Sequence, residues 1–226
     1  GKYYPESHPL HMKESIEIRH MTAKDEDILT SRTLLKQGVA LQRFLGNILV
    51  DRNVDINSLL VGDKNAIIVA ARISGYGSEY ETRIACPACL SNVKYNFDLN
   101  DNVVSEGVLN EDEAHVTQDS TIMLKLPTSG VNLELKMLTG HEENQIAKTA
   151  KARKKQNAEI TITSQLHRMI ASVNGERDAR IIRQFVSTMP ARDSRFVRKV
   201  YKKAVPNVDL TQNFECSECG HEQLLE

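Results

Sequence analysis

Apolar residues at helical spacing dominate the first part of the chain. Three segments carry this spacing, each with apolar side chains along one side: residues 22–37, 39–49 and 62–73. Thr22 is suited to cap the first helix and Gly38 to end it, so the pattern predicts a compact helical bundle. Residues 1–15 show no such period and predict an extended arm.

The second half of the chain changes to strand periodicity. Residues 121–126 and 131–137 alternate apolar and polar positions around the turn residues Pro127 to Gly130. This pattern predicts a β-hairpin with one face toward a core. Residues 98–119 are acidic and irregular, so we expect a surface loop before the hairpin.

Helices are predicted again after this hairpin. Residues 139–142 (TGHE) have the spacing of a capping box and begin one helix, and a further helix is expected over residues 161–173. Asn174-Gly175 could instead form a tight turn that pairs residues 170–173 with 176–179 as strands. Because the second of these segments is a poor strand former, we expect the helix.

All four cysteines lie in two Cys-x-x-Cys pairs, each flanked by short runs of strand-forming residues. The cysteines are Cys86, Cys89, Cys216 and Cys219. Four thiolates in two such turns fit the tetrahedral coordination of structural zinc, and this closed shell leaves no position for a substrate. We therefore predict one structural Zn²⁺ ion held by all four thiolates. The alternative is a separate metal on each pair, with a histidine such as His221 as a further ligand.

Other interpretations of the cysteines fit less well. Four cysteines in 226 residues, with no recognisable signal peptide, are not the disulfide framework of a secreted domain. Reduced cysteines and no targeting segment predict a cytoplasmic protein. Between Cys89 and Cys216 lie 126 residues, whereas the two knuckles of an ordinary zinc ribbon lie about 15–20 residues apart. The metal would therefore tie the end of the chain to its first half.

The composition excludes several classes of protein. Hydrophobic residues make up 40% of the chain and charged residues 26%, as in a soluble globular protein. A net charge of −1 and the absence of tryptophan argue against a dedicated nucleic-acid-binding protein. The longest apolar run, residues 66–71, is too short to span a membrane. No catalytic motif is present, so we expect no enzymatic activity and no small-molecule substrate.

These patterns predict an α+β protein with an N-terminal helical bundle, a split four-cysteine zinc ribbon formed by two distant knuckles, and an inserted β-hairpin with helices. The expected divisions are an extended N-terminal arm over residues 1–15, a helical domain over 16–79, the split zinc ribbon over 80–98 with 207–226, and an inserted α/β region over 99–206.

Two further groups of residues are candidates for contacts with partners. Tyr3 and Tyr4 would anchor the arm if it orders on another protein, the alternative being a disordered terminus. A basic run on one helix would contact phosphate or an acidic protein, the alternative being a solvated face. Its residues are Lys151, Arg153, Lys154 and Lys155. A nucleic-acid-binding adaptor would add to this run Arg198, Lys199, Lys202 and Lys203.

Several segments in a fixed order carry a family resemblance. They are residues 18–27 (IRHMTAKDED), 62–64 (GDK), 72–77 (RISGYG), 126–130 (LPTSG), 138–143 (LTGHEE) and 189–195 (MPARDSR), together with both Cys-x-x-Cys pairs. No single segment is specific, but their ordered combination over residues 16–222 resembles the baseplate hub protein family of contractile-tailed, T-even-like bacteriophages.

The resemblance implies a non-enzymatic structural or assembly component of a phage tail baseplate. Such a protein is made in the host cytoplasm, is located in the virion tail and has other baseplate and tail proteins as partners. It could be a permanent hub subunit or a factor that leaves after hub assembly. The alternative function is a zinc-ribbon adaptor for nucleic acid or transcription.

Overall fold

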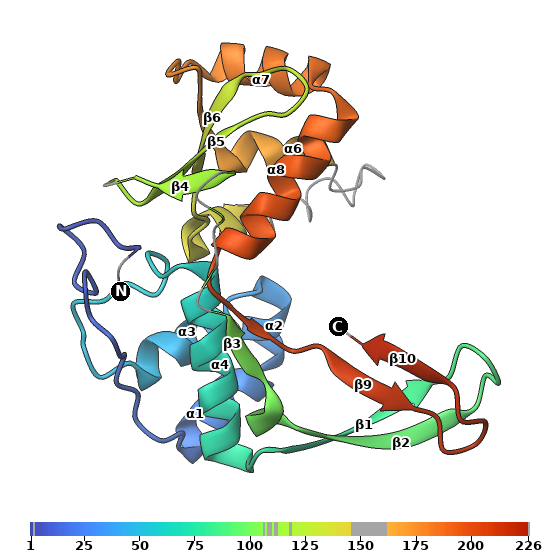
Figure 1. The fold of residues 1–226 in the computed structure, drawn as a ribbon. Coiled ribbons are helices and arrows are strands. Elements are labelled where there is room, and N and C mark those ends of the chain that lie inside the picture. Colours follow the sequence, from blue (N-terminus) through green and yellow to red (C-terminus); the bar gives the residue numbers. More distant parts are fainter. Residues whose placement is uncertain are drawn as a thin grey trace. The chain divides into compact units, whose positions relative to one another are not determined.

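The protein combines helices with antiparallel strands, and its predicted α+β class is confirmed. The structure is a computed structural model that describes all residues except 2, 106, 108, 109, 111, 112, 118, 146–161 and 226. The chain divides into two compact units (Figure 1). Unit 1 contains residues 1–17, 51–64 and 106–206, and unit 2 contains residues 18–50, 65–105 and 207–226. The four-part division expected from the sequence stays a prediction.

Four helices carry the first part of the chain. They are α1 (Ala23–Thr30), α2 (Arg32–Gln37), α3 (Ala40–Ile48) and α4 (Val61–Tyr76). The predicted first helix is therefore two helices, because Ser31 has an extended backbone and its side chain accepts a hydrogen bond from the Leu34 N–H. Gly38 ends α2 in the left-handed conformation, with a φ of 74°, as the sequence predicted. No helix among the described residues has the length and apolar character needed to cross a membrane.

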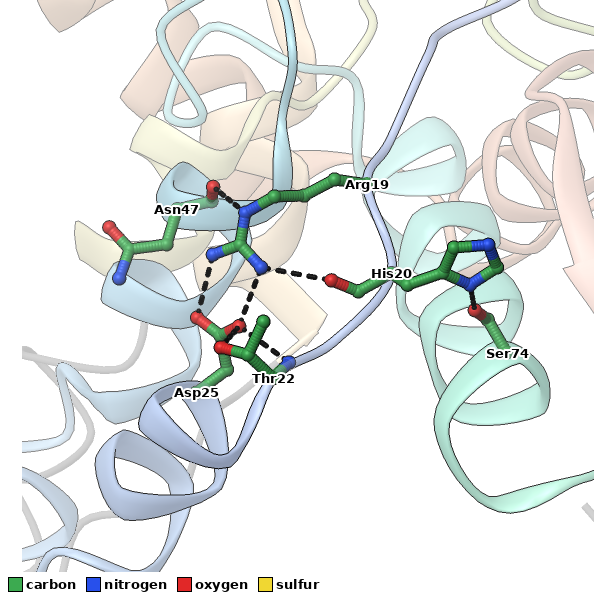
Figure 2. A network of polar contacts seen from close by, with 6 residues as sticks. All are labelled: Arg19, His20, Thr22, Asp25, Asn47 and Ser74. Atoms are coloured by element: carbon green, nitrogen blue, oxygen red, sulfur yellow. Dashed lines mark hydrogen bonds and ion pairs between the residues drawn. The ribbon is translucent and has the colours of Figure 1, made fainter.

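A buried carboxylate fixes the start of α1 (Figure 2). Asp25 is 1% exposed and accepts hydrogen bonds from both terminal nitrogens of the Arg19 guanidinium, at 2.7 and 3.0 Å. The Thr22 N–H and hydroxyl donate to the same carboxylate at 2.9 and 2.8 Å. Arg19 also donates to the carbonyls of Asn47 and His20, so it joins the segment before α1 to the end of α3. These bonds, the one from Arg19 foremost, hold the pKa of Asp25 well below its usual range.

The strands of unit 2 form three antiparallel pairs. They are β1 (Glu79–Ala85) with β2 (Asn92–Asp98), β3 (Val103–Ser105) with β8 (Asn207–Asp209), and β9 (Gln212–Glu215) with β10 (Glu222–Leu225). The prediction of a loop over residues 98–119 was wrong in two places, since β3 and β4 (Ala114–Val116) lie in it. Each of these strands is only three residues long and is held by backbone bonds to a partner strand, so local periodicity does not reveal it.

Unit 1 contains a four-stranded antiparallel sheet in the order β4-β5-β6-β7. The predicted hairpin is confirmed as β5 (Thr121–Lys125) and β6 (Asn132–Lys136), with Ile122 opposite Leu135 and Leu124 opposite Leu133. Alternate apolar side chains of residues 121–126 and 131–137 are buried, as predicted for one face of the hairpin, namely Ile122, Leu124, Leu126, Leu133, Leu135 and Met137. The helices of this unit include α6 (Ile162–Met169), α7 (Ala179–Thr188) and α8 (Ala191–Ala204).

The helix predicted over residues 161–173 was wrong at its C-terminal end. Residues 170–173 form β7 (Ile170–Val173), which pairs with β6. Asn174 and Gly175 have φ angles of 50° and 84°, and Val173 bridges Glu176, so the Asn-Gly turn signal was correct. The alternative, in which residues 170–173 pair with residues 176–179, was right that residues 170–173 form a strand. The main partner of this strand is β6, not residues 176–179. Pairing with a distant strand overrode the helical pattern of the segment.

Polar side chains of α8 tie this helix to the β5–β6 hairpin. The fully buried carboxylate of Asp193 accepts the backbone N–H groups of Thr128 and Ser129 at 2.8 and 3.0 Å, and so closes the turn between the two strands. The Tyr201 hydroxyl accepts the Leu138 N–H at 2.9 Å, and burial raises the pKa of Tyr201 to about 12. The helix therefore fixes both ends of strand β6.

Replacing Asp25 by Asn tests the network at α1. Asn keeps the size of the side chain but loses the charge, so we expect the free energy of unfolding at pH 7 to fall by about 1.5–3 kcal/mol. The lowered pKa stabilises the fold above the unfolded value of about 3.9, and this contribution is lost as the pH falls through the folded value. The difference between wild type and variant in urea unfolding should therefore shrink below pH 4. Asp27→Asn, an exposed change on the same helix, should leave stability nearly unchanged.

Candidate metal centre

Two hairpins of unit 2 present their Cys-x-x-Cys sequences in turns with the same backbone geometry. In each turn the first cysteine donates its N–H to the carbonyl five residues later and accepts an N–H from four residues later. These bonds run from Cys86 to Ser91 at 3.0 Å, from Leu90 to Cys86 at 2.9 Å, from Cys216 to His221 at 2.9 Å and from Gly220 to Cys216 at 2.8 Å. The sequence repeat is therefore a structural repeat.

The residue after the second cysteine of each turn has a left-handed backbone. Gly220 has a φ of 69° and Leu90 a φ of 62°. Glycine adopts this conformation freely, whereas a side chain costs about 1–2 kcal/mol. The Leu90 side chain is 80% exposed, so it gains little packing in return. The first turn thus holds a strained residue at the point where the second turn has glycine.

The two turns bring all four sulfur atoms together. Cys86 Sγ lies 3.7 Å from Cys219 Sγ, and Cys89 Sγ lies 3.8 Å from Cys216 Sγ. All four lie within 4.8 Å of one another, and they are the only such group of potential metal ligands among the residues that the structure describes. Zinc–sulfur bonds of about 2.3 Å in a tetrahedron place the sulfur atoms about 3.8 Å apart. A disulfide requires about 2.05 Å, so the cysteines are free thiols in a spacing suited to a metal ion.

A small apolar core lies under the thiols and joins the hairpins, which run side by side (Figure 1). Phe214 of β9 is 1% exposed and packs with Val93 and the two buried cysteines. Its ring meets Tyr95 of β2 edge-on, with 5.2 Å between the ring centroids. The Tyr95 hydroxyl donates to the Asn213 carbonyl at 2.6 Å. Phe214 and Tyr95 thus align the two turns, and sequence analysis did not identify this role for them.

The four thiols differ in their surroundings. Cys86 and Cys216 are buried, whereas Cys89 and Cys219 face solvent. Hydrogen bonds from the side chain and backbone of Ser91 lower the pKa of Cys89 to about 6. The His221 backbone lowers the pKa of Cys219, but the neighbouring Cys89 and the other thiols raise it more, to about 12. Four adjacent thiols therefore resist joint ionisation unless a cation offsets their charge.

The other predicted site residues lie elsewhere. His221 contributes its backbone to the second turn and is not part of the sulfur cluster. Tyr4 is buried in unit 1, where its hydroxyl is bonded within the chain, and Tyr3 lines a cavity of the same unit. The basic run of Lys151, Arg153, Lys154 and Lys155 lies outside the described residues. The four basic residues of α8 that the adaptor function would use are exposed, namely Arg198, Lys199, Lys202 and Lys203.

Comparison with protein families decides the class to which this fold belongs. The family model described as T4 bacteriophage base plate protein matches residues 6–226, which is nearly the whole chain. The chain belongs to this family of T4 phage baseplate proteins. Searches of the curated proteins and of the solved structures gave no match. The predicted family resemblance is thereby confirmed, and a structural role in a phage baseplate with it.

The family match covers both units and both cysteine turns of the baseplate protein. Its location is accordingly the virion tail, and its partners are other tail proteins. The segments that carried the resemblance include Arg19, Thr22 and Asp25 of the network at α1, and Asp193 near the start of α8. In this baseplate protein, several of the resembling segments thus contain buried contacts that hold the fold together.

Removing the Phe214 ring tests the core under the thiols. Phe214→Ala should lower the free energy of unfolding by about 3–5 kcal/mol, because it deletes the largest buried side chain between the hairpins. Leu224→Ala, on β10 of the same hairpin but 68% exposed, should change it by less than about 0.5 kcal/mol. Thermal unfolding followed by circular dichroism measures both. Equal effects of the two changes would show that Phe214 does not support the site.

Proposed function

We propose that this protein is a non-enzymatic component of the baseplate hub of a contractile phage tail, and that one Zn²⁺ ion holds its two cysteine hairpins together as a split zinc ribbon. The family match supports the baseplate part of this proposal. The sulfur spacing of 3.7 and 3.8 Å across the two hairpins carries the zinc part.

The four cysteines fit zinc in number, chemistry and support. Thiolates are ligands that Zn²⁺ binds tightly, and four of them complete its tetrahedral shell. The Ser91 hydroxyl and the backbone N–H groups of the turns hydrogen-bond to the sulfurs and would stabilise them as thiolates. Bound zinc would contribute folding free energy on the order of 10 kcal/mol, as in small zinc peptides.

The donor set also favours a structural role over a catalytic one. Catalytic zinc sites use three protein ligands and leave one position for water or substrate. In this site the four thiols of the two turns would occupy all positions of the tetrahedron around the ion. The metal would therefore shape a surface of the protein, and its function would be to bind neighbouring subunits through that surface.

Metal analysis tests the split ribbon. We expect one zinc ion per chain in protein purified without added metal, measured by native mass spectrometry and elemental analysis. Cys216→Ser should lose the metal and unfold the β9–β10 hairpin, because it removes a buried ligand. Ser217→Ala, in the same turn but not a ligand, should retain one zinc. If the metal-free protein remains fully stable after strong chelation, the zinc proposal is wrong.

Fractionation of infected cells tests whether this protein is a component of the baseplate hub. We expect antibodies to this protein, or mass spectrometry, to find it in baseplates and in central hub intermediates. Presence in mature tails would identify a permanent subunit, and presence only in intermediates would identify an assembly factor. Co-purification with polymerase or nucleic acid instead of tail proteins would contradict the proposal and support the adaptor function.

A further inference from the structure

Residues 3–13 pack against the rest of unit 1 through buried aromatic and polar contacts. Residues 3–13 form successive turns, in which Tyr4 and Leu10 are each 3% exposed. The Tyr4 hydroxyl donates to the Asp63 carboxylate at 2.7 Å and accepts the Leu60 N–H at 2.9 Å. The segment is thus a folded strap over residues 55–63.

One histidine in this strap is held in a single charge state by its hydrogen bonds. His8 Nδ1 accepts the Leu10 N–H at 3.1 Å, so this nitrogen carries no proton. His8 Nε2 lies 2.8 Å from Ser58 Oγ, and the Ser58 hydroxyl donates its own proton to the Asp55 carbonyl at 2.7 Å. Ser58 must therefore accept a proton from Nε2. Both bonds together require a neutral His8 with its proton on Nε2.

A proton added to Nδ1 would point directly at the Leu10 N–H. The Leu10 N–H would then lose its acceptor, and two donors would face each other. The His8 ring is stacked on Tyr4, with ring centroids 4.3 Å apart and an angle of 17° between the planes. A displacement of His8 therefore also disturbs the packing of Tyr4. We propose that residues 3–13 are a pH-gated strap, which leaves its place on unit 1 when His8 becomes protonated.

The groups around His8 include both signs of charge. Asp55, Asp119, Lys136 and His141 line the same cavity of about 450 Å³ as His8, and Asp63 is reached through Tyr4. The acidic groups would favour a cation, as would the Tyr4 ring. Burial acts in the opposite direction and lowers the pKa of His8. The pKa of His8 is therefore lower in the folded protein than in the unfolded chain. Docking of the strap is unaffected above pH 7 and weakens as the pH falls below the ordinary histidine value of about 6.5.

A second histidine of the strap provides a contrast. His11 Nδ1 lies 2.6 Å from the Tyr4 carbonyl, which can only accept, so Nδ1 carries a proton whether His11 is neutral or charged. A proton added to His11 goes to Nε2 and leaves this bond intact. Protonation should therefore release the strap through His8 and not through His11.

The strap is expected to open in mildly acidic solution, which amide hydrogen exchange by NMR on the full chain measures. The reporters are the Leu10 and Leu60 amides, which donate to His8 and Tyr4. Between pH 7.5 and 5.5, after correction for the intrinsic exchange rate, their protection should fall by up to about tenfold. The amides of β5 and β6 should keep their protection.

Two variants make the test specific. His8→Gln retains a donor toward Ser58 but does not titrate, so protection of Leu60 should not depend on pH in this range. His11→Gln should keep the pH dependence of the wild type. Unchanged protection of Leu60 at pH 5.5 in the wild type, an equal loss in His8→Gln, or a simultaneous loss in β5 and β6 would each overturn the proposal.

Discussion

Unit 2 depends on the contact between two hairpins that are far apart in the sequence. Each hairpin alone is a two-stranded sheet, which is marginal in water. The buried core that they share consists of Cys86, Val93, Phe214 and Cys216, which is a small apolar surface for holding two hairpins together. The proposed metal ion, bound by the four sulfurs, would supply the stability that this core lacks. The cysteines lie beside the contact of Tyr95 with Phe214 and Asn213, through which side chains align β1–β2 with β9–β10.

Three buried carboxylates connect separate segments of the chain by hydrogen bonds. Asp25 joins the segment before α1 to α3 through Arg19, and Asp193 joins α8 to the β5–β6 turn through two backbone N–H groups. Glu134, on β6, accepts hydrogen bonds from Ser172 on β7 and Thr121 on β5 at 2.8 and 3.0 Å. Each acid thus adds side-chain hydrogen bonds between separate segments of the chain. Because a buried charge is costly without partners, each also penalises any arrangement in which its donors are missing.

The sequence predicted those features that a local pattern determines. The β5–β6 hairpin follows from strict alternation, the end of α2 from Gly38, and the sulfur cluster from the paired spacing of the cysteines. Sequence analysis did not predict the features that depend on a partner distant in the sequence. β7 is a strand because β6 offers it an edge, and Leu90 adopts a left-handed backbone because the turn requires one there. Gly220 marks the same position in the second turn, so comparison of the two turns could have revealed the conformation of Leu90. No local sequence pattern identifies Phe214 and Tyr95 as the residues that align the two turns.

The order of the two units along the chain determines when the cysteine cluster can form during folding. The chain leaves unit 2 after β3, continues as residues 106–206 of unit 1, and returns to unit 2 in β8, which pairs with β3. The first pair of thiols is thus synthesised well before the second, and the ribbon cannot close until β9 and β10 have been made. Unit 1, to which residues 106–206 belong together with residues 1–17 and 51–64, has its own sheet and contains neither cysteine hairpin, so this closure is not part of its fold. Metal binding would therefore be the last step that completes the protein, and only a chain that carries both hairpins would present the surface that the ribbon shapes for its neighbours in the baseplate.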